Sequence, residues 1–355
     1  MKKLTIGVLF GGCSTEHEVS LSSSAAVLNH LNLNREKYDI VMIGITRDGQ
    51  WYRYEGEVDR IQEDSWSLHP SCTPVLLSPN RAMKGLIELV GTEYRFTPLD
   101  AVFPVLHGKN GEDGTMQGLL ELSGIPFVGC DTLSSAICMD KAIAKTLVAA
   151  AGIGVPPFIT VTAGDPVFET VAAAEKLGFP LYVKPAKSGS SIGITKVYNK
   201  QELMAGIEAA HLHDSKVVIE RHVDGFELGC AVLGNTPYLV MGEMDEIELA
   251  GEFFDHEEKY SLSTASIHLP ARIDPNKAKE ATEMALRIYR ALGCSGLARV
   301  DLFLTKDGTL LFNEVNTIPG FTAKSRYPSM MREAGMNFPE LLDRLVAAAV
   351  QEVRA

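Results

Sequence analysis

The chain has 355 residues, 46% hydrophobic and 22% charged, so it is too long for one ordinary core and too apolar to be disordered. Its formal net charge of -12 argues against a protein that coats nucleic acid, because neutralising phosphates requires clustered Lys and Arg. A nucleotide-binding cleft that is locally basic is still compatible with an acidic surface.

Cysteine usage and hydropathy predict the compartment. The six cysteines are scattered with no Cys-x-x-Cys pair, which indicates reduced thiols without a disulfide or zinc framework. The apolar run at 4–10 ends at Gly11-Gly12, so it predicts a first strand and not a signal peptide. Since no apolar run approaches the length of a membrane span, we expect a cytoplasmic protein that does not bind membranes.

Apolar runs in the first part of the chain alternate with a helical pattern. The runs at 4–10, 39–45 and 100–106 accompany a helix predicted over 19–31, which is typical of an open parallel α/β sheet. A second helix is predicted over 140–151, and the Gly- and Pro-rich residues after it indicate a domain boundary.

The middle of the chain has the pattern of a mixed α+β domain. Asp165 and Pro166 predict the start of a helix over 167–177, with Gly178 as its C-cap. A further helix is expected at 201–211, among short strands predicted at 181–184, 193–197, 217–220 and 226–233.

The last part of the chain begins with a polar segment, 250–268, in which hydrophobic residues do not repeat at a helical or strand period. It is predicted to be a long loop and a candidate lid. Asp274 and Pro275 then cap a helix that ends at Gly293, and two strands are expected within 296–316. The final helix carries an apolar stripe formed by Leu341, Leu342, Leu345, Val346, Ala349 and Val353.

The two strands within 296–316 flank Asp307-Gly308, which is the strongest short-range signal for a β-hairpin. With these two residues as the loop, counting back predicts three facing pairs: Lys306 with Thr309, Asp301 with Glu314, and Arg299 with Asn316. Arg299, Asp301, Glu314 and Asn316 would then share one face of the hairpin.

Facing carboxylates at Asp301 and Glu314 would repel each other unless a cation lies between them. Together with Asn316 they offer only oxygen ligands, which suits magnesium bound by a few carboxylates and substrate phosphates. The alternative is a solvated hairpin that carries ordinary surface charges.

A loop of small residues, 187–193, follows Lys184 and lies between two predicted strands. It is neither a Walker A motif nor a dinucleotide fingerprint, but its backbone N–H groups and hydroxyls suit phosphate oxygens, and Lys184 adds charge. The alternative is a flexible surface turn. Glu220, at the end of an apolar strand, and Glu227 are weaker candidates for contacts with a nucleotide base.

Two loops follow predicted strands of the first domain. The turn at 10–18 opens a helix whose N-terminus favours a carboxylate ligand, while Glu16 could hold an ammonium group. The alternative is a turn that Ser14 merely caps. The loop at 104–114 ends a strand with three glycines and His107, where such sheets bind ligands, although a lone histidine is more often structural.

Four motifs together resemble those of the D-alanine:D-alanine ligases, in the ATP-grasp superfamily, over residues 4 to about 350. They are HGKNGEDG at 107–114, CMDK at 138–141, KSGSSIG at 187–193 and NEVNTIPGFT at 313–322. The resemblance implies a homodimer of multidomain chains, α/β and α+β, with an ATP-grasp fold. Its parts would be an N-terminal open parallel α/β substrate domain at 1–135, a central ATP-grasp subdomain at 136–225, and a C-terminal subdomain at 226–355 that includes the lid loop 250–268.

The resemblance also implies roles in nucleotide and metal binding. The ATP phosphates would contact Lys141, Lys184, Lys259 and Ser191. Adenine would be held by Glu220 and the backbone near Val223, and the ribose by Glu227. Two magnesium ions, for which manganese can substitute, would bind Asp301, Glu314 and Asn316.

Further implied roles concern the amino acid substrates. Glu16 would hold the ammonium of the first D-alanine and His107 would lie near its carboxylate, while Ser190, Tyr260 and Glu16 would form a hydrogen-bonded trio. Ser325, with Arg326 beside it, would meet the carboxylate of the second substrate. Arg299 and the N–H of Gly320 would stabilise the oxyanion.

The implied reaction joins D-alanine to a second D-alanine through an acyl phosphate, with ADP and phosphate as products, in the synthesis of cell wall peptidoglycan precursors. At Arg326 the chain resembles vancomycin-resistance relatives that accept D-serine or D-lactate. Tyr260 argues against D-lactate, so D-serine stays open as the second substrate. Two positions depart from the residues that are most frequent in the family: His256 stands in place of a lid tyrosine, and Arg221 in place of a lysine. A nucleotide-binding regulator without catalysis is the other alternative, and the intact residues Arg299, Asp301, Glu314 and Asn316 argue against it.

Overall fold

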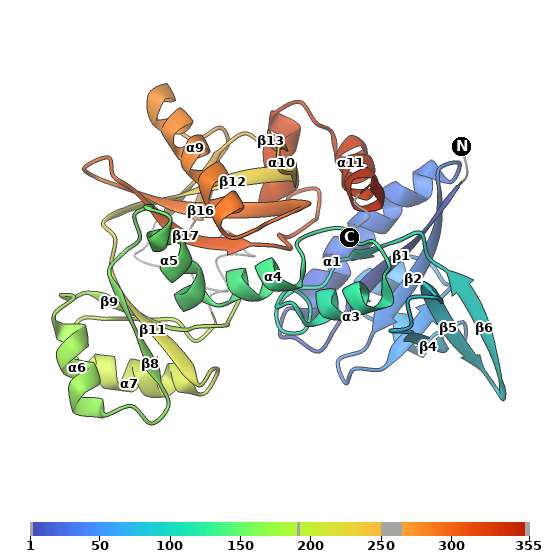
Figure 1. Cartoon of the computed structure of the whole chain (residues 1–355), viewed down its shortest axis with the longest axis horizontal. Coiled ribbons are helices and arrows are strands. Elements are labelled where there is room, and N and C mark those ends of the chain that lie inside the picture. The colour runs from blue at the N-terminus through green and yellow to red at the C-terminus, as the bar shows by residue number, and fades with distance from the viewer. Residues whose placement is uncertain (1–2, 190–191, 250–264, 352–355) are drawn as a thin grey trace.

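The computed structural model of the chain describes residues 3–189, 192–249 and 265–351. Its strands form three sheets of seven, four and six strands, which follow one another along the chain. Figure 1 shows the seven-stranded sheet at one end of the molecule and the other two sheets at the opposite end. None of the helices in the described part of the chain has the length and apolar character that a membrane crossing requires.

The seven-stranded sheet has the order β6-β5-β4-β3-β2-β1-β7, and only β2, β1 and β7 are parallel. The predicted parallel sheet is therefore correct for these three strands, while the other four strands pair antiparallel. The strands are β1 (Leu4–Gly11), β2 (Tyr38–Ile45), β3 (Trp51–Tyr54), β4 (Thr73–Leu77), β5 (Gly85–Val90), β6 (Glu93–Pro98) and β7 (Ala101–Pro104).

Strand β1 is buried on both faces because helices pack on either side of it. Ile6, Val8 and Phe10 pack with α1 (His17–Leu31), whereas Leu9 packs with α3 (Thr115–Ser123). The alternation of side chains along a strand thus places two helices on opposite faces of one sheet. Short helical segments complete this part of the chain: η1 (Asn32–Asn34), α2 (Asp59–Gln62) and η2 (Trp66–Leu68).

The four-stranded sheet is antiparallel with the order β10-β9-β11-β8, and it includes one strand, β8, that was not predicted. Asp165 does not cap α6 as expected; its carboxylate accepts a hydrogen bond from Thr162 N instead. The elements are α4 (Thr132–Met139), α5 (Lys141–Ala150), β8 (Phe158–Thr162), α6 (Val167–Glu175), β9 (Leu181–Pro185), β10 (Thr195–Val197), α7 (Lys200–His211) and β11 (Lys216–Arg221).

The six-stranded sheet has the order β15-β14-β12-β16-β17, with β13 paired to β12. The predicted loop at 250–268 is wrong at its end, because 265–268 form an edge strand that pairs with β14; residues 250–264 lie outside the described residues. The strands are β12 (Gly225–Asn235), β13 (Tyr238–Met241), β14 (Asp245–Leu249), β15 (Ala265–His268), β16 (Leu297–Thr305) and β17 (Leu310–Asn316).

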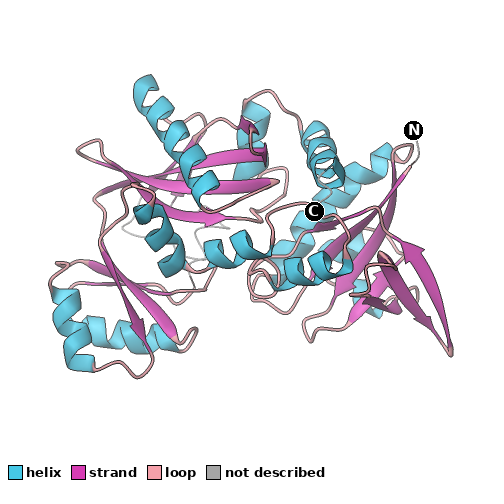
Figure 2. Cartoon of the chain, in the orientation of Figure 1, coloured by secondary structure: helices cyan, strands magenta, loops and turns pink. Residues whose placement is uncertain are grey.

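Helices join this sheet to the rest of the molecule. The buried face of α9 (Pro275–Ala291) packs on the six-stranded sheet. The apolar stripe of α11 (Phe338–Gln351) packs beside α10 (Arg326–Glu333) and into the same core as α1. In Figures 1 and 2, α11 accordingly lies next to α1, so the end of the chain returns to the first domain.

Candidate active site

In the hairpin of β16 and β17, the two predicted carboxylates lie opposite each other. Asp301 lies opposite Glu314, and Arg299 lies opposite Asn316. The predicted turn is wrong, however, because Thr305 N donates to Thr309 O at 3.0 Å, so that residues 306–308 form a three-residue loop. Gly308 supplies its left-handed position, with φ of 84°.

A β-bulge restores the register that this longer loop would otherwise shift. Leu302 faces Phe312, and without a bulge Asp301 would face Asn313. The extra residue in β17 brings Glu314 opposite Asp301 instead, and the Asn313 side chain donates to Glu227 Oε2 at 3.2 Å. Asn313, which was not predicted, therefore joins the same face as the carboxylates.

Asp301 is fully buried and is neutralised by a guanidinium group. Arg299 donates from Nε to Oδ1 at 2.8 Å and from Nη2 to Oδ2 at 2.7 Å. Asn316 Nδ2 donates to Oδ2 at 2.9 Å. Within residues 3–189, 192–249 and 265–351, no three or more His, Cys, Asp and Glu side chains form a group that could hold a metal ion. The predicted set is of another kind, because it consists of two carboxylates and an amide.

The first residue of α5 connects the hairpin to the glycine-rich loop. Lys141 Nζ donates to Ser188 O at 2.7 Å and lies 3.7 Å from Glu314 Oε2. The helix starts here because the Asp140 carboxylate accepts hydrogen bonds from Ala142 N and Ile143 N. The structure thus brings Lys141, Glu314 and the loop together from three separate parts of the sequence.

A second cluster is centred on Glu220, which ends β11. Lys145 Nζ lies 2.7 Å from Glu220 Oε2, and Lys184 Nζ lies 2.9 Å from Oε1. Burial alone would raise the pKa of Glu220, but the charges of Lys145 and Lys184 outweigh it and lower that pKa to about 2. Lys145, which was not predicted, is a fully buried lysine whose pKa burial lowers.

Arg326 is held by carboxylates and not by the neighbouring Ser325. It donates from Nε and Nη2 to both oxygens of Asp245, at 2.8 and 2.7 Å, and from Nη1 to Glu227 at 3.3 Å. Its Nη2 lies 3.7 Å from Asp301 Oδ1. The guanidinium passes under Gly229, where an added Cβ would lie 2.3 Å from Nη2. Arg326 therefore links the predicted ribose carboxylate to the predicted metal carboxylate.

The predicted amino-terminal residues meet at Glu16, which is buried. An added Cβ would lie 2.5 Å from Glu16 Oε2 at Gly189 and 2.7 Å from it at Gly108, so a side chain at either position would displace this carboxylate. The turn after β1, the loop after β7 and the glycine-rich loop therefore converge on one carboxylate.

This convergence yields a prediction for Gly189→Ala. The added methyl group would push Glu16 away, and we expect a rise of at least about tenfold in the KM for the first amino acid. Steady-state kinetics would measure it. Gly118→Ala is the matched control, because its Cβ would lie 3.7 Å from the Thr132 side chain, at ordinary contact distance. An unchanged KM in Gly189→Ala would contradict this placement of Glu16.

His107 is buried and anchored by protein groups on both ring nitrogens. Nδ1 lies 3.0 Å from Ile318 O and Nε2 lies 3.3 Å from Ser23 Oγ. Burial lowers its pKa, although the nearby Glu16 carboxylate opposes this. His107 therefore ties the first domain to the segment after β17.

Glu112, in the loop that precedes α3, was not singled out from the sequence. Its Oε1 accepts a hydrogen bond from Gly108 N at 2.9 Å. Burial, and next the charge of Glu16, raise the pKa of Glu112 to about 8. The carboxyl group is thus mostly protonated at pH 7.

The raised pKa predicts how stability depends on pH. The ordinary pKa is 4.5 and the folded value is about 8, so the folded protein binds more protons and loses stability as pH rises between these values. Glu112→Gln, which mimics the protonated form, should remove about 1–2 kcal/mol of this loss. Thermal unfolding of both proteins at pH 6 and 8.5 measures it, and parallel pH curves would contradict the assignment.

The remaining predicted residues lie around the same region or outside the described residues. Ser325 Oγ accepts a hydrogen bond from Thr322 N at 3.0 Å and would lie 3.2 Å from a Cβ added at Gly320. Val223 lies in the short connection between β11 and β12. Five residues discussed above are outside the described residues: Ser190, Ser191, His256, Lys259 and Tyr260.

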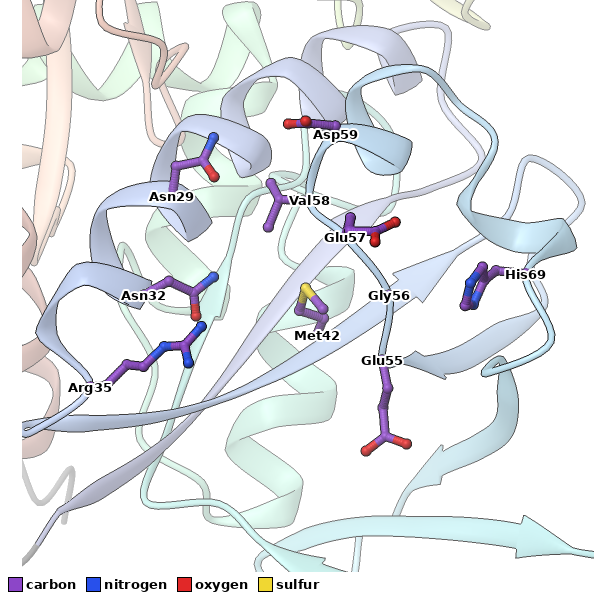
Figure 3. Close-up of a pocket in the computed structure, with 10 residues that line it drawn as sticks. All are labelled: Asn29, Asn32, Arg35, Met42, Glu55, Gly56, Glu57, Val58, Asp59 and His69. Carbon is purple, nitrogen blue, oxygen red and sulfur yellow. The ribbon is translucent and has the colours of Figure 1, made fainter.

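A surface pocket of about 540 Å³ lies apart from these residues, between the end of α1 and the segment after β3 (Figure 3). Two of its acidic groups have partners at the surface: Glu55 pairs with Arg53, and Glu57 with Arg60. Figure 3 shows Arg35 and Glu55 on opposite sides of the pocket, so they do not form one binding constellation.

Two family models match the chain. The model described as D-ala D-ala ligase N-terminus covers residues 5–130, and the one described as D-ala D-ala ligase C-terminus covers residues 147–347. The stretch between the two matched ranges contains α4 and the start of α5.

Known proteins resemble this chain over its full length. The vancomycin B-type resistance protein VanB of Enterococcus faecalis is 45% identical over 99% of this chain and 100% of its own. A D-alanine--D-alanine ligase of Caldicellulosiruptor bescii is 43% identical over 100% of this chain and 97% of its own. The solved structure of VanG D-Ala:D-Ser ligase from Enterococcus faecalis is 52% identical, with a TM-score of 0.89 over 98% of this chain and 100% of that one. The chain belongs to the D-alanine:D-alanine ligase family, which includes the vancomycin-resistance ligases.

Proposed function

We propose that this protein joins D-alanine to a second small D-amino acid with the hydrolysis of ATP to ADP and phosphate, for cell wall peptidoglycan precursors. The observation that carries the proposal is the convergence of Glu16, Gly189 and Lys141 with the carboxylate pair of the hairpin. An ammonium-binding carboxylate, a phosphate loop and an acidic cation site then lie next to one another. The relatives named above are ligases and resistance proteins of this family, which supports the assignment.

ATP is expected between the four-stranded and six-stranded sheets. Lys141 and Lys184 would contact its phosphates, together with Ser191 and Lys259, and Glu220 and Val223 would meet adenine. Glu227, which already accepts from Asn313 and Arg326, has a fixed carboxylate for the ribose hydroxyls. This arrangement surrounds a triphosphate with lysines inside an acidic protein.

The donor set of the hairpin fits magnesium. Asp301, Glu314 and the Asn316 amide present oxygen atoms on one face, the chemistry that this ion prefers alongside phosphate oxygens. These residues would hold two ions, and manganese is expected to substitute. When bound, the ions neutralise charge on the phosphates. Arg299, which is paired with Asp301 beside this donor set, is proposed to face the reacting carboxyl group.

The proposed reaction has two steps. A carboxylate oxygen of the first D-alanine, whose ammonium Glu16 holds, attacks the γ-phosphorus of ATP and gives an acyl phosphate and ADP. The amine of the second substrate then attacks the acyl carbon, and phosphate leaves with that oxygen. Arg299 and the N–H of Gly320 stabilise the oxyanion between these events. Glu16, Ser190 and Tyr260 are proposed to form a hydrogen-bonded trio that links the lid loop to the substrate.

D-serine is the second candidate for the acceptor, since a D-Ala:D-Ser ligase is 52% identical to this chain. Phosphate release from ATP is measured with D-alanine alone, then with D-serine or D-lactate added, and the products are identified by mass spectrometry. We expect D-alanyl-D-alanine with D-alanine alone and no ester with D-lactate. Predominance of D-alanyl-D-serine would assign the resistance-type activity, and no turnover with any acceptor would reject the proposal.

Two further proposals concern the protein in the cell. A cytoplasmic location is expected, because ATP is the phosphoryl donor of the proposed reaction. A homodimer is expected from the family, and light scattering of the purified protein would measure its mass.

A further inference from the structure

Two buried lysines share one carboxylate where the four-stranded and six-stranded sheets meet. Lys145 and Lys184 each lie within 3 Å of a different oxygen of Glu220, at 2.7 and 2.9 Å. The side chains of Lys145, Lys184 and Glu220 are 1%, 10% and 2% exposed. The cluster therefore carries an excess positive charge in a place that water hardly reaches.

The two lysines are held differently. Lys145, on α5, also donates to Asn313 O at 3.1 Å and lies 5.6 Å from the centre of the Phe312 ring, so it is anchored to the six-stranded sheet. Lys184 is on β9, which leads directly into the glycine-rich loop, and it is the more exposed of the two. Lys145 is therefore fixed to the six-stranded sheet, whereas Lys184 is held by Glu220 and lies 5.5 Å from the centre of the Tyr182 ring.

The proposed function makes conflicting demands on this cluster. Lys184 should contact a phosphate, and Glu220 should accept a hydrogen bond from the adenine amino group, yet Lys184 now occupies Glu220 Oε1. Glu220 is buried, and a buried carboxylate that lost every cationic partner would be strongly disfavoured. A second lysine that never leaves Glu220 removes this conflict.

We propose that Lys145 is a positioning residue that keeps Glu220 charged and aimed at adenine while Lys184 leaves Glu220 for the triphosphate. The inference rests on the proposed function. On binding, Oε1 exchanges the Lys184 ammonium for the adenine amino N–H, and Oε2 stays with Lys145. Glu220 keeps two partners throughout, and the phosphates gain the charge of Lys184.

The exchange makes Lys145 a determinant of base selectivity. An ionised carboxylate only accepts hydrogen bonds, so it pairs with the amino group of adenine and repels the carbonyl oxygen that hypoxanthine has at the same position. Without Lys145, Glu220 would retain Lys184 or take up a proton. If Lys184 stayed on Glu220, its contact with the phosphates would be weakened. If Glu220 took up a proton, its carboxyl group could donate a hydrogen bond to the carbonyl oxygen of ITP.

Steady-state kinetics with ATP and with ITP test this inference. Lys145→Met should raise the KM for ATP by at least about tenfold and reduce the ATP-to-ITP ratio of kcat/KM by at least about tenfold, with a smaller change in kcat. Lys145→Arg, which keeps the charge, should restore most of that ratio. Lys277→Met is the control, because Lys277 lies on α9 and pairs with the exposed Glu280, and both values should stay within about twofold of wild type.

The outcomes separate this inference from the proposed function. Wild-type kinetics in Lys145→Met would overturn the role of Lys145 and leave the ligase assignment standing, whereas absence of wild-type turnover would overturn the assignment itself. A crystal structure of the wild type with a non-hydrolysable ATP analogue tests the exchange without a variant or turnover. It should show Lys184 on a phosphate and Lys145 still on Glu220; Lys184 remaining on Glu220 would overturn the inference.

Discussion

Replacing Glu314 with Gln should lower kcat by roughly a thousandfold, which is the upper range for removing one group that stabilises developing charge. Glu314 faces Asp301 across the hairpin and lies 3.7 Å from Lys141, so it supplies one of two negative charges proposed to anchor the cations beneath the phosphates. The amide keeps the shape of the side chain, which is 22% exposed, and the fold should survive. Phosphate release and circular dichroism measure the two effects.

The control for this variant is Glu340→Gln. Glu340 lies at the surface of α11 and pairs with Arg344, and its replacement should leave kcat unchanged. Near-normal activity in Glu314→Gln would remove the proposed metal assignment of the hairpin.

Replacing Arg326 with Met should destabilise the protein by about 3–5 kcal/mol. Arg326 binds both oxygens of Asp245, which is completely buried, and also contacts Glu227. Methionine fills similar space but leaves the Asp245 charge with only the Gly229 N–H as a hydrogen-bond donor among the described contacts. Urea unfolding measures the loss as a lower midpoint.

Two further variants serve as a control and as a rescue for Arg326→Met. Arg344→Met breaks the exposed pair with Glu340 and should cost less than about 1 kcal/mol. Adding Asp245→Asn to Arg326→Met removes the stranded charge, so the double variant should recover part of the loss. A wild-type midpoint for Arg326→Met would show that the buried pair contributes nothing.

The hairpin shows how far the sequence could specify the site. The Asp-Gly pair predicted a hairpin, and the facing of Asp301 with Glu314 is confirmed. That success depended on two compensating departures, a loop one residue longer than expected and a bulge that inserts one residue into β17. Neither departure changes the apolar alternation near the turn enough to be read from the sequence.

Contacts between distant segments were the part that the sequence could not predict. Lys145 and Arg326 are buried because carboxylates from other strands neutralise them, and Asn313 joins the site face through a bulge. A lysine in an amphipathic helix is ordinarily exposed, so only the folded arrangement reveals its partner. Motif spacing identified the loops, whereas their convergence on Glu16 depends on how the seven-stranded and four-stranded sheets are placed.

The fold followed sequence patterns most closely where continuous apolar runs mark buried strands or a helical period marks a buried helix face. Strands β1, β2, β9 and β11 and helices α1 and α5 lie close to their predicted ranges. The antiparallel strands at the edge of the first sheet and the short β8 were not predicted, because partly exposed short strands give weak periodicity.

The transfer of oxygen from substrate to phosphate tests the proposed chemistry most directly. The protein would be incubated with ATP, magnesium and D-alanine carrying oxygen-18 in its carboxylate, and the released phosphate analysed by mass spectrometry. We expect one labelled oxygen in each phosphate, because the carboxylate oxygen that attacks the γ-phosphorus leaves with it. Dipeptide formation with unlabelled phosphate would contradict the acyl phosphate and, with it, the roles given to the lysines and carboxylates of the site.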